Sequence, residues 1–270
     1  MSVATVSSGP GSKLAVIPRD SFFALADGSS EIREAMESVG GEKFGPNDLT
    51  RVKMPTGGST TWEIADGVGG VDHSPNITGA LCFVQKAGVL WGEFEPKPGA
   101  MPVLRSHDLV IGEQVGPLPD HMGDTLEKCR VPGTENRFFW DEERNPYNRF
   151  GSGKNGQGKR CREQRLLFIL RRGDIYPLCV AVQPGSLNNW RRFFLNLPKL
   201  GIVYWRAVVE LGLEKAVNPA GQTYARIVPK LVGQLSVEDG ELIRTQYQTT
   251  LQRVAPVVAE QEGEIEGDDA

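Results

Sequence analysis

The chain has 270 residues, of which 39% are hydrophobic and 24% are charged, a composition that supports a buried core and excludes disorder throughout. Its longest apolar runs, such as residues 166–170, hold only about five residues, and because a membrane-spanning helix needs about 20, we exclude an integral membrane protein. The net charge of −4 hides an uneven distribution, since residues 144–206 carry thirteen Lys and Arg against two acidic residues, whereas residues 260–269 carry six acidic residues.

The N-terminal part of the chain is predicted to hold a leader, a short helix and two strands. Residues 1–20 are rich in Ser and Gly and are expected to form a flexible leader. A serine cap and two following glycines predict a short helix over residues 30–39. A β-rich composition bounded by breakers predicts a strand at residues 77–85, and Gly88 is expected to turn the chain into a second strand at 89–94.

Residues 95–164 interrupt this pattern and are interpreted as an insertion. The stretch is rich in proline and glycine and has no sustained helical or strand period. Loops longer than about 12–15 residues without secondary structure are uncommon in compact domains unless they are functional or disordered. We therefore expect the insertion to serve binding.

Regular structure is predicted to resume after the insertion. Apolar spacing from Leu187 to Leu197 indicates a helix with one apolar face, and Ser236 to Asp239 has the form of a capping box at the start of a last helix. The predicted elements are strands at residues 166–170 and 176–182, a helix at 187–197, strands at 202–211 and 222–232, and a helix at 236–254.

The order of these elements favours a mainly β fold with added helices, of the α+β class. Five strands with a helix between the third and the fourth have the connectivity of an OB-fold, a frequent platform for oligonucleotides. We expect an OB-like five-stranded barrel with a long insertion and a C-terminal helix. This single domain is expected to span residues 21–258, after the leader and before an acidic tail at 259–270.

The densest group of candidate binding residues lies between Arg137 and Arg162. Aromatic residues alternate with arginines there, and a glycine-rich loop with two lysines follows. Single-stranded nucleic acid exposes phosphates and unstacked bases, which bind cations and flat rings respectively, and glycines let backbone N–H groups approach a phosphate. The alternative is that the aromatic residues are core and the cations form a solvated face.

The predicted nucleic-acid-binding residues comprise this group and the arginines that follow it, and Trp140, Tyr147 and Phe150 among them are expected to stack on bases. The full set is Arg137, Trp140, Arg144, Tyr147, Arg149, Phe150, Lys154, Lys159, Arg160, Arg162, Arg171, Arg172, Arg191 and Arg192.

The glycine-rich loop also resembles a phosphate-binding P-loop in its spacing. Residues 153–159 match G-x-x-x-x-G-K, but Arg160 stands where that motif requires Ser or Thr to hold magnesium. No apolar strand precedes the loop, so we exclude a nucleotide triphosphatase.

A metal site is the main alternative to a passive binder. Zinc takes nitrogen and sulfur ligands, and the weak candidates for them are His107, His121, Cys129 and Cys161. Their spacing matches no compact zinc motif, so we expect no cofactor, with zinc as the alternative. Each of the three histidines adjoins an aspartate, which leaves open a metal-dependent nuclease or another DNA-processing enzyme.

The acidic tail and the basic middle of the chain suggest a regulated polyanion-binding protein. Residues 260–269 are expected to be disordered, to compete with nucleic acid for the basic surface and to recruit protein partners. The absence of a basic stretch followed by an apolar one at residues 1–10 predicts no secretory signal. Four dispersed cysteines favour the reducing cytoplasm.

This combination resembles single-stranded DNA-binding proteins of phages and bacteria, which join a basic OB-type body to an acidic C-terminal tail. The bacterial tail ends in an aromatic residue, whereas this sequence ends in Asp268, Asp269 and Ala270. The resemblance implies sequence-tolerant binding of single-stranded DNA, with RNA not excluded, during replication or recombination in the cytosol of a host cell.

A narrower resemblance concerns the block from Cys129 to Cys161, with C-R-V-P-G-T-E-N near its start and R-F-G-S-G-K-N-G-Q-G-K-R-C at its end. It is similar to a set of phage and mobile-element proteins with additional cysteines in this region, which suggest a zinc site. Leu104 and Val131 stand near those positions here. The last alternative is a phage structural or host-interaction protein whose basic face contacts another protein.

Overall fold

The structure is a computed structural model that describes residues 14–17, 49–65, 69–97, 100–174, 176–218 and 221–255. Most of the predicted leader, the predicted helix at 30–39 and the acidic tail therefore lie outside the described residues. The described part is a mixed α+β structure made mostly of strands with few helices. None of its helices is long and apolar enough to cross a membrane.

The strands fall into one large sheet and a small two-stranded sheet of β2 and β3. The bounds are β1 (Arg51–Val52), β2 (Trp62–Ala65), β3 (Val71–Ser74), β4 (Asn76–Leu90), β5 (Leu104–Ser106), β6 (Ile111–Gln114), β7 (Arg137–Phe139), β8 (Cys161–Arg171), β9 (Leu178–Val182), β10 (Ala207–Val217) and β11 (Thr223–Gln234).

Helical segments are short, apart from those that flank the sheet. The α-helices are α3 (Asp120–Glu127), α4 (Pro184–Asn196) and α5 (Val237–Leu242), and α5 continues as a π-helix, η6 (Ile243–Gln248). The 3-10 turns are η2 (Pro146–Asn148), η3 (Lys154–Gly156), η4 (Pro198–Leu200) and η5 (Tyr204–Arg206).

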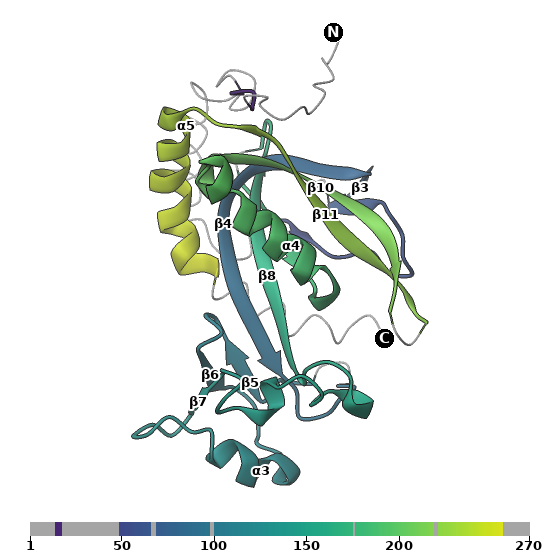
Figure 1. Cartoon of the computed structure of the whole chain (residues 1–270), viewed down its shortest axis with the longest axis vertical. Coiled ribbons are helices and arrows are strands. Elements are labelled where there is room, and N and C mark those ends of the chain that lie inside the picture. Colours follow the sequence, from purple (N-terminus) through teal and green to yellow (C-terminus); the bar gives the residue numbers. More distant parts are fainter. Residues whose placement is uncertain are drawn as a thin grey trace.

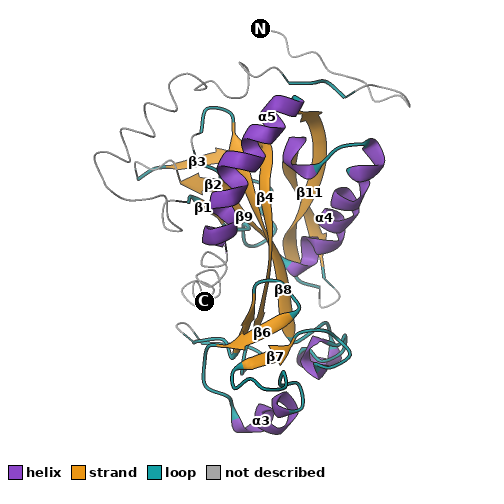
Figure 2. Cartoon of the chain, turned by 90° about the vertical axis from the view of Figure 1, so that its left-hand side faces the viewer, coloured by secondary structure: helices purple, strands orange, loops and turns teal. Residues whose placement is uncertain are grey.

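The large sheet forks at its longest strand, β4. One edge of β4 pairs with β8 from Gly79 to Leu90, while the other edge pairs with β10 near its start and with β5 near its end. The sheet thus has the order β1-β9-β8-β4-β10-β11 at one end of β4 and β8-β4-β5-β6-β7 at the other. Figures 1 and 2 show the long β4–β8 ribbon joining these two parts. We call the part with β1, β9, β10 and β11 the body, and the part with β5, β6 and β7 (residues 90–161) the lobe.

Helices cover both faces of the body. Successive side chains of a strand point to opposite faces, and in β8 Leu167 and Ile169 pack with Trp190 of α4. The alternate residues Leu166 and Phe168 pack on the other face, in the cluster that contains residues of the C-terminal helix. Burial on both faces explains why residues 166–170 of this strand are continuously apolar.

The lobe has a core of its own, so the stretch expected to be irregular is folded. Phe138 and Trp140 pack there with Met122 and Leu126 of α3. The short strands β5, β6 and β7 and the helix α3 could not be predicted from periodicity, because each is too short to show a period.

The two strands predicted around Gly88 are one strand, so the prediction of a turn at this glycine was wrong. Gly88 lies inside β4 with the Trp140 ring against it, and a Cβ there would approach that ring to 2.5 Å. Close packing, and not chain reversal, requires glycine here.

The predicted α4 and the cap of the last helix are confirmed. The Ser236 hydroxyl oxygen accepts a hydrogen bond from the Asp239 amide at 3.0 Å. The sheet is not closed into a barrel in the described residues, so the OB-like barrel is unconfirmed.

Candidate nucleic-acid interface

A cleft of about 800 Å³ lies between the β4–β8 ribbon, helix α4 and the glycine-rich loop of the lobe. It brings together chain segments that are more than a hundred residues apart in the sequence. The lining residues are Val84, Lys86, Phe150, Gly158, Lys159, Cys161, Arg162, Glu163, Arg165, Pro184, Leu187, Asn188, Trp190, Arg191, Phe194, Leu195 and Tyr204.

Three cations in this cleft, Lys86, Arg165 and Arg191, form a like-charged group that we call the cationic cluster. Lys86 stands directly opposite Arg165 in the strand register, a placement that destabilises a sheet when both residues carry the same charge. Burial lowers the pKa of Arg165, and the positive charge of Arg191 lowers it further while Glu163 opposes the shift. In the described part of the chain no carboxylate forms an ion pair with any of the three.

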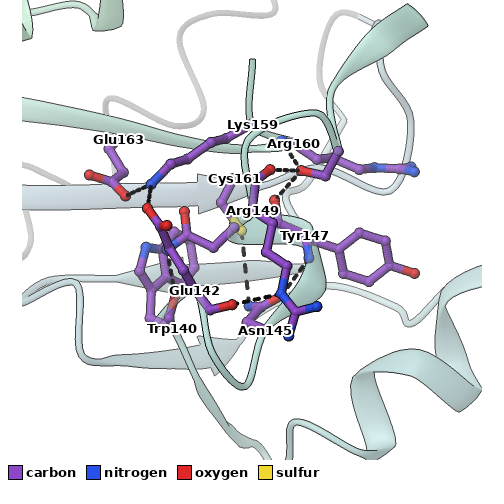
Figure 3. A network of polar contacts seen from close by, with 11 residues as sticks. Trp140, Glu142, Asn145, Tyr147, Arg149, Lys159, Arg160, Cys161 and Glu163 are labelled. Carbon is purple, nitrogen blue, oxygen red and sulfur yellow. Dashed lines mark hydrogen bonds and ion pairs between the residues drawn. The ribbon is translucent and has the colours of Figure 1, made fainter. Parts of the chain in front are cut away.

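A second group of charges in the cleft is internally compensated. Lys159 forms ion pairs with Glu142 and, at 3.4 Å, with Glu163, as Figure 3 shows. Burial opposes the charge of Lys159, but these two carboxylates outweigh it and raise the pKa of its ammonium group. The positive charge of Lys159 is therefore neutralised by its carboxylate partners, and we do not count it with the cationic cluster.

Aromatic side chains line the cleft beside these cations. Phe150, in the glycine-rich block, is 83% exposed, an unusual state for a phenylalanine. Phe194 and Tyr204 are half-buried on the side of the body, with ring centres 5.7 Å apart. The cleft thus combines unpaired cations with accessible rings.

Four of the predicted binding residues meet in this cleft: Phe150, Lys159, Arg162 and Arg191. Two residues of the cationic cluster, Lys86 and Arg165, were not among the predicted binding residues. The sequence did hold a signal for both, since each is a charged residue at the end of an apolar strand segment.

The prediction that Trp140 stacks on bases was wrong, because its side chain is fully buried in the core of the lobe. Tyr147 is half-buried and packs on Arg160, whose guanidinium carbon lies 5.5 Å from that ring and 4.2 Å from the ring of Phe94. Arg160 also donates a hydrogen bond to the Gly92 carbonyl. Arg160 is thus engaged inside the lobe.

Most of the other predicted cations lie outside the cleft and contact acidic or carbonyl groups. Arg149 donates hydrogen bonds to the carbonyls of Glu142 and Glu143 at 2.8 and 2.7 Å. Arg172 and Arg192 are exposed and do not line the cleft. The ion pairs are Arg137–Glu113, Arg144–Asp141, Lys154–Glu95 and Arg171–Asp174.

The glycine-rich loop does not present its backbone as a phosphate cradle. The amides of Gly151 and Gly153 both donate to the carbonyl of Gly158, at 2.7 and 3.2 Å. The amides of Gly156 and Gln157 also donate within the loop. These four N–H groups are already bonded, so the expectation that the loop glycines serve phosphate contact was wrong for them.

The candidate metal ligands do not converge on one point. Cys129 and Cys161 are buried in the core of the lobe, where burial, as the largest cause, raises the pKa of both thiols. The His121 ring lies instead beside the Gly92 carbonyl, with Nε2 at 3.2 Å. Among the residues that the structure describes, no group of three or more His, Cys, Asp or Glu side chains is arranged to hold a metal ion.

Comparison with known proteins adds no relative to this description. No protein-family model, no curated protein and no solved structure matches the chain.

Proposed function

We propose that this protein binds single-stranded nucleic acid, DNA in the first instance, in the cleft between α4 and the glycine-rich loop. The observation that carries the proposal is the cationic cluster of Lys86, Arg165 and Arg191. In the described residues none of these three like charges forms an ion pair with a carboxylate. They repel one another, although Glu163 attracts Arg165, and a bound polyanion would offset the repulsion.

The shape of the site favours an unpaired strand over a duplex. A concave cleft with cations and exposed rings matches a strand that offers phosphates and base faces together. A duplex keeps its bases stacked inside and is read by an element that enters a groove. Sequence preference is expected to be weak, because the rings of Phe150 and Phe194 offer stacking and no hydrogen bonds to base edges.

The biological setting of this activity is part of the proposal. The resemblance to phage and mobile-element single-stranded DNA-binding proteins suggests an accessory role in replication or recombination in the host cytoplasm. Binding in the cleft does not require an OB-like barrel, since the β4–β8 ribbon and α4 supply the walls.

The test is fluorescence-polarisation binding of the protein to a labelled oligonucleotide of about 30 nucleotides, single- and double-stranded, between about 50 and 200 mM salt. We expect tighter binding of the single strand and a log–log salt slope of about −0.7 for each phosphate contact. Arg165→Gln and Arg191→Gln are each expected to lower the affinity about tenfold, equivalent to ~1.4 kcal/mol, and to make the slope shallower by about 0.7.

The matched control is Arg244→Gln, which removes an exposed arginine that pairs with Glu241 on the opposite side of the sheet. It should bind like the unchanged protein. Arg165→Gln and Arg191→Gln should not lower the melting temperature, because they relieve repulsion. Equal binding of duplex and single strand, or unchanged affinity in both variants, would rule out the proposed site.

A further inference from the structure

A second, apolar cavity opens at the C-terminal end of α4. It has a volume of about 360 Å³, within the size range of small-ligand pockets. Its walls come from the end of α4, from η4 and from η5. The lining residues are Phe194, Leu197, Pro198, Gly201, Ile202, Val203, Tyr204 and Trp205.

This cavity adjoins the cationic cleft. Phe194 and Tyr204 line both, so the two spaces adjoin at these rings. The cavity therefore lies next to the path of a chain molecule bound along the cleft.

The aromatic walls of the cavity are held in place by packing and by one hydrogen bond. The rings of Tyr204 and Trp205 meet edge to face with centres 5.1 Å apart, and Phe194 packs on Tyr204. The Tyr204 hydroxyl accepts a hydrogen bond from Gln248 Nε2 at 3.0 Å. At the rim, Val203 remains 41% exposed, which leaves apolar surface to be covered.

We propose that this cavity receives an unpaired nucleobase of the strand whose phosphates lie in the cationic cleft. The inference rests on the proposed function and adds a stacking site to it. Every base has an aromatic face, and the cavity walls carry almost no polar groups, so the site accepts any base without reading its edge. The neighbouring cationic cluster selects an anionic chain over an apolar peptide.

Trp205 makes this inference directly measurable. The other four tryptophans, Trp62, Trp91, Trp140 and Trp190, are at most 3% exposed, whereas Trp205 is half-buried and lines the cavity. A stacked base quenches the fluorescence of the indole that it touches. The titrants are an oligothymidylate and an abasic strand of the same length, which keeps the phosphates and lacks the bases.

We expect the oligothymidylate to quench the intrinsic tryptophan fluorescence and the abasic strand to bind more weakly without quenching. Trp205→Phe should abolish the quenching, while Trp91→Phe, a buried tryptophan in the lobe, should retain it. Trp205→Ala should weaken binding of the oligothymidylate about 5- to 150-fold, the range that corresponds to one stacked base.

A second pair of variants tests the same site without altering Trp205. Val203→Glu places a carboxylate at the rim of the cavity, and Val217→Glu places one on a more exposed valine at the far end of β10. Only Val203→Glu is expected to weaken binding. If the single strand binds but quenching persists in Trp205→Phe, or if the abasic strand binds equally well, the base site is refuted and the cleft stands. If no strand binds, the proposed function fails as well.

Discussion

Gly88 shows how one residue couples the β4–β8 ribbon to the core of the lobe. A Cβ at this position would lie 2.5 Å from the ring of Trp140 and 2.8 Å from a methyl group of Leu109. Both neighbours are held by surrounding core residues, so they cannot move away cheaply. We expect Gly88→Ala to lower the free energy of unfolding by about 1–3 kcal/mol, as for other overpacked cores.

Urea denaturation followed by tryptophan fluorescence measures this change. The matched control is Gly123→Ala in α3 of the same lobe, where an added Cβ meets no atom within 4 Å. That substitution should be neutral or stabilising by up to about 1 kcal/mol, because alanine favours helix over glycine. A Gly88→Ala variant as stable as its parent would show that the packing against Trp140 is loose.

Residue-scale chemistry also explains which candidate binding residues could be predicted. The positive excess of residues 144–206 is real in the sequence, but acidic partners from outside that range, such as Glu95 and Glu142, pair with individual cations. The aromatic residues next to those cations divided between core and surface, since Trp140 is buried and Phe150 is exposed. Composition identifies such residues but not the face on which each one lies.

At the scale of elements, the C-terminal helix donates a hydrogen bond to a β-bulge in β4. The pairing of β4 with β8 shifts register between Leu81 and Phe83, which leaves Cys82 as an extra residue in a bulge. The Cys82 carbonyl accepts a hydrogen bond from Gln248 Nε2 at 3.1 Å, and both residues are buried. A buried carbonyl that loses its donor bears its full desolvation penalty.

Gln248→Met keeps the length of the side chain but removes the donor. We expect a loss of about 1–3 kcal/mol in the free energy of unfolding. Gln252→Met, at an exposed position four residues further along the same helix, should change stability by no more than about 0.5 kcal/mol. Thermal unfolding followed by circular dichroism compares the two, and equal stability of both variants would show that the bond to Cys82 is dispensable.

The sequence predicts well those elements that are long enough to show a repeat of apolar residues. The apolar positions from Leu187 to Leu197 repeat over three turns and predict α4, and the cap at Ser236 predicts the start of the last helix. By contrast, β4 was divided at Gly88, because a glycine required for packing and a glycine required for a turn look the same in sequence. The division of the sheet between the body and the lobe depends on pairings between distant segments, for which one sequence carries no local signal.

At the scale of the whole molecule, the cleft forms only where the body and the lobe meet. The cationic cluster comes from β4, β8 and α4, while Phe150 and Lys159 come from the glycine-rich block. The cationic cluster belongs to the body, whereas the 83% exposed ring of Phe150 belongs to the lobe. A ligand that contacts both therefore links them, and its affinity depends on the β4–β8 ribbon that sets their spacing.

The acidic tail is expected to influence binding in this cleft through its charge. Six carboxylates fall within residues 260–269, which lie outside the described residues. We propose that this polyanionic segment competes with a nucleic-acid strand for the cationic cluster, at an effective concentration set by the tether. We expect truncation after Ala259 to tighten single-strand binding severalfold at low salt.

Salt separates this competition from an effect on folding. Between about 50 mM and 1 M salt the Debye length falls to about 3 Å, so the gain from truncation should shrink as both the tail and the strand are screened. A full-length variant with the six tail carboxylates changed to amides should match the truncated protein, because it removes the charge and keeps the length. An amide variant that binds like the unchanged chain, or a truncated protein with unaltered affinity at low salt, would show that the tail does not compete for the cleft and would direct attention to its role in recruiting partners.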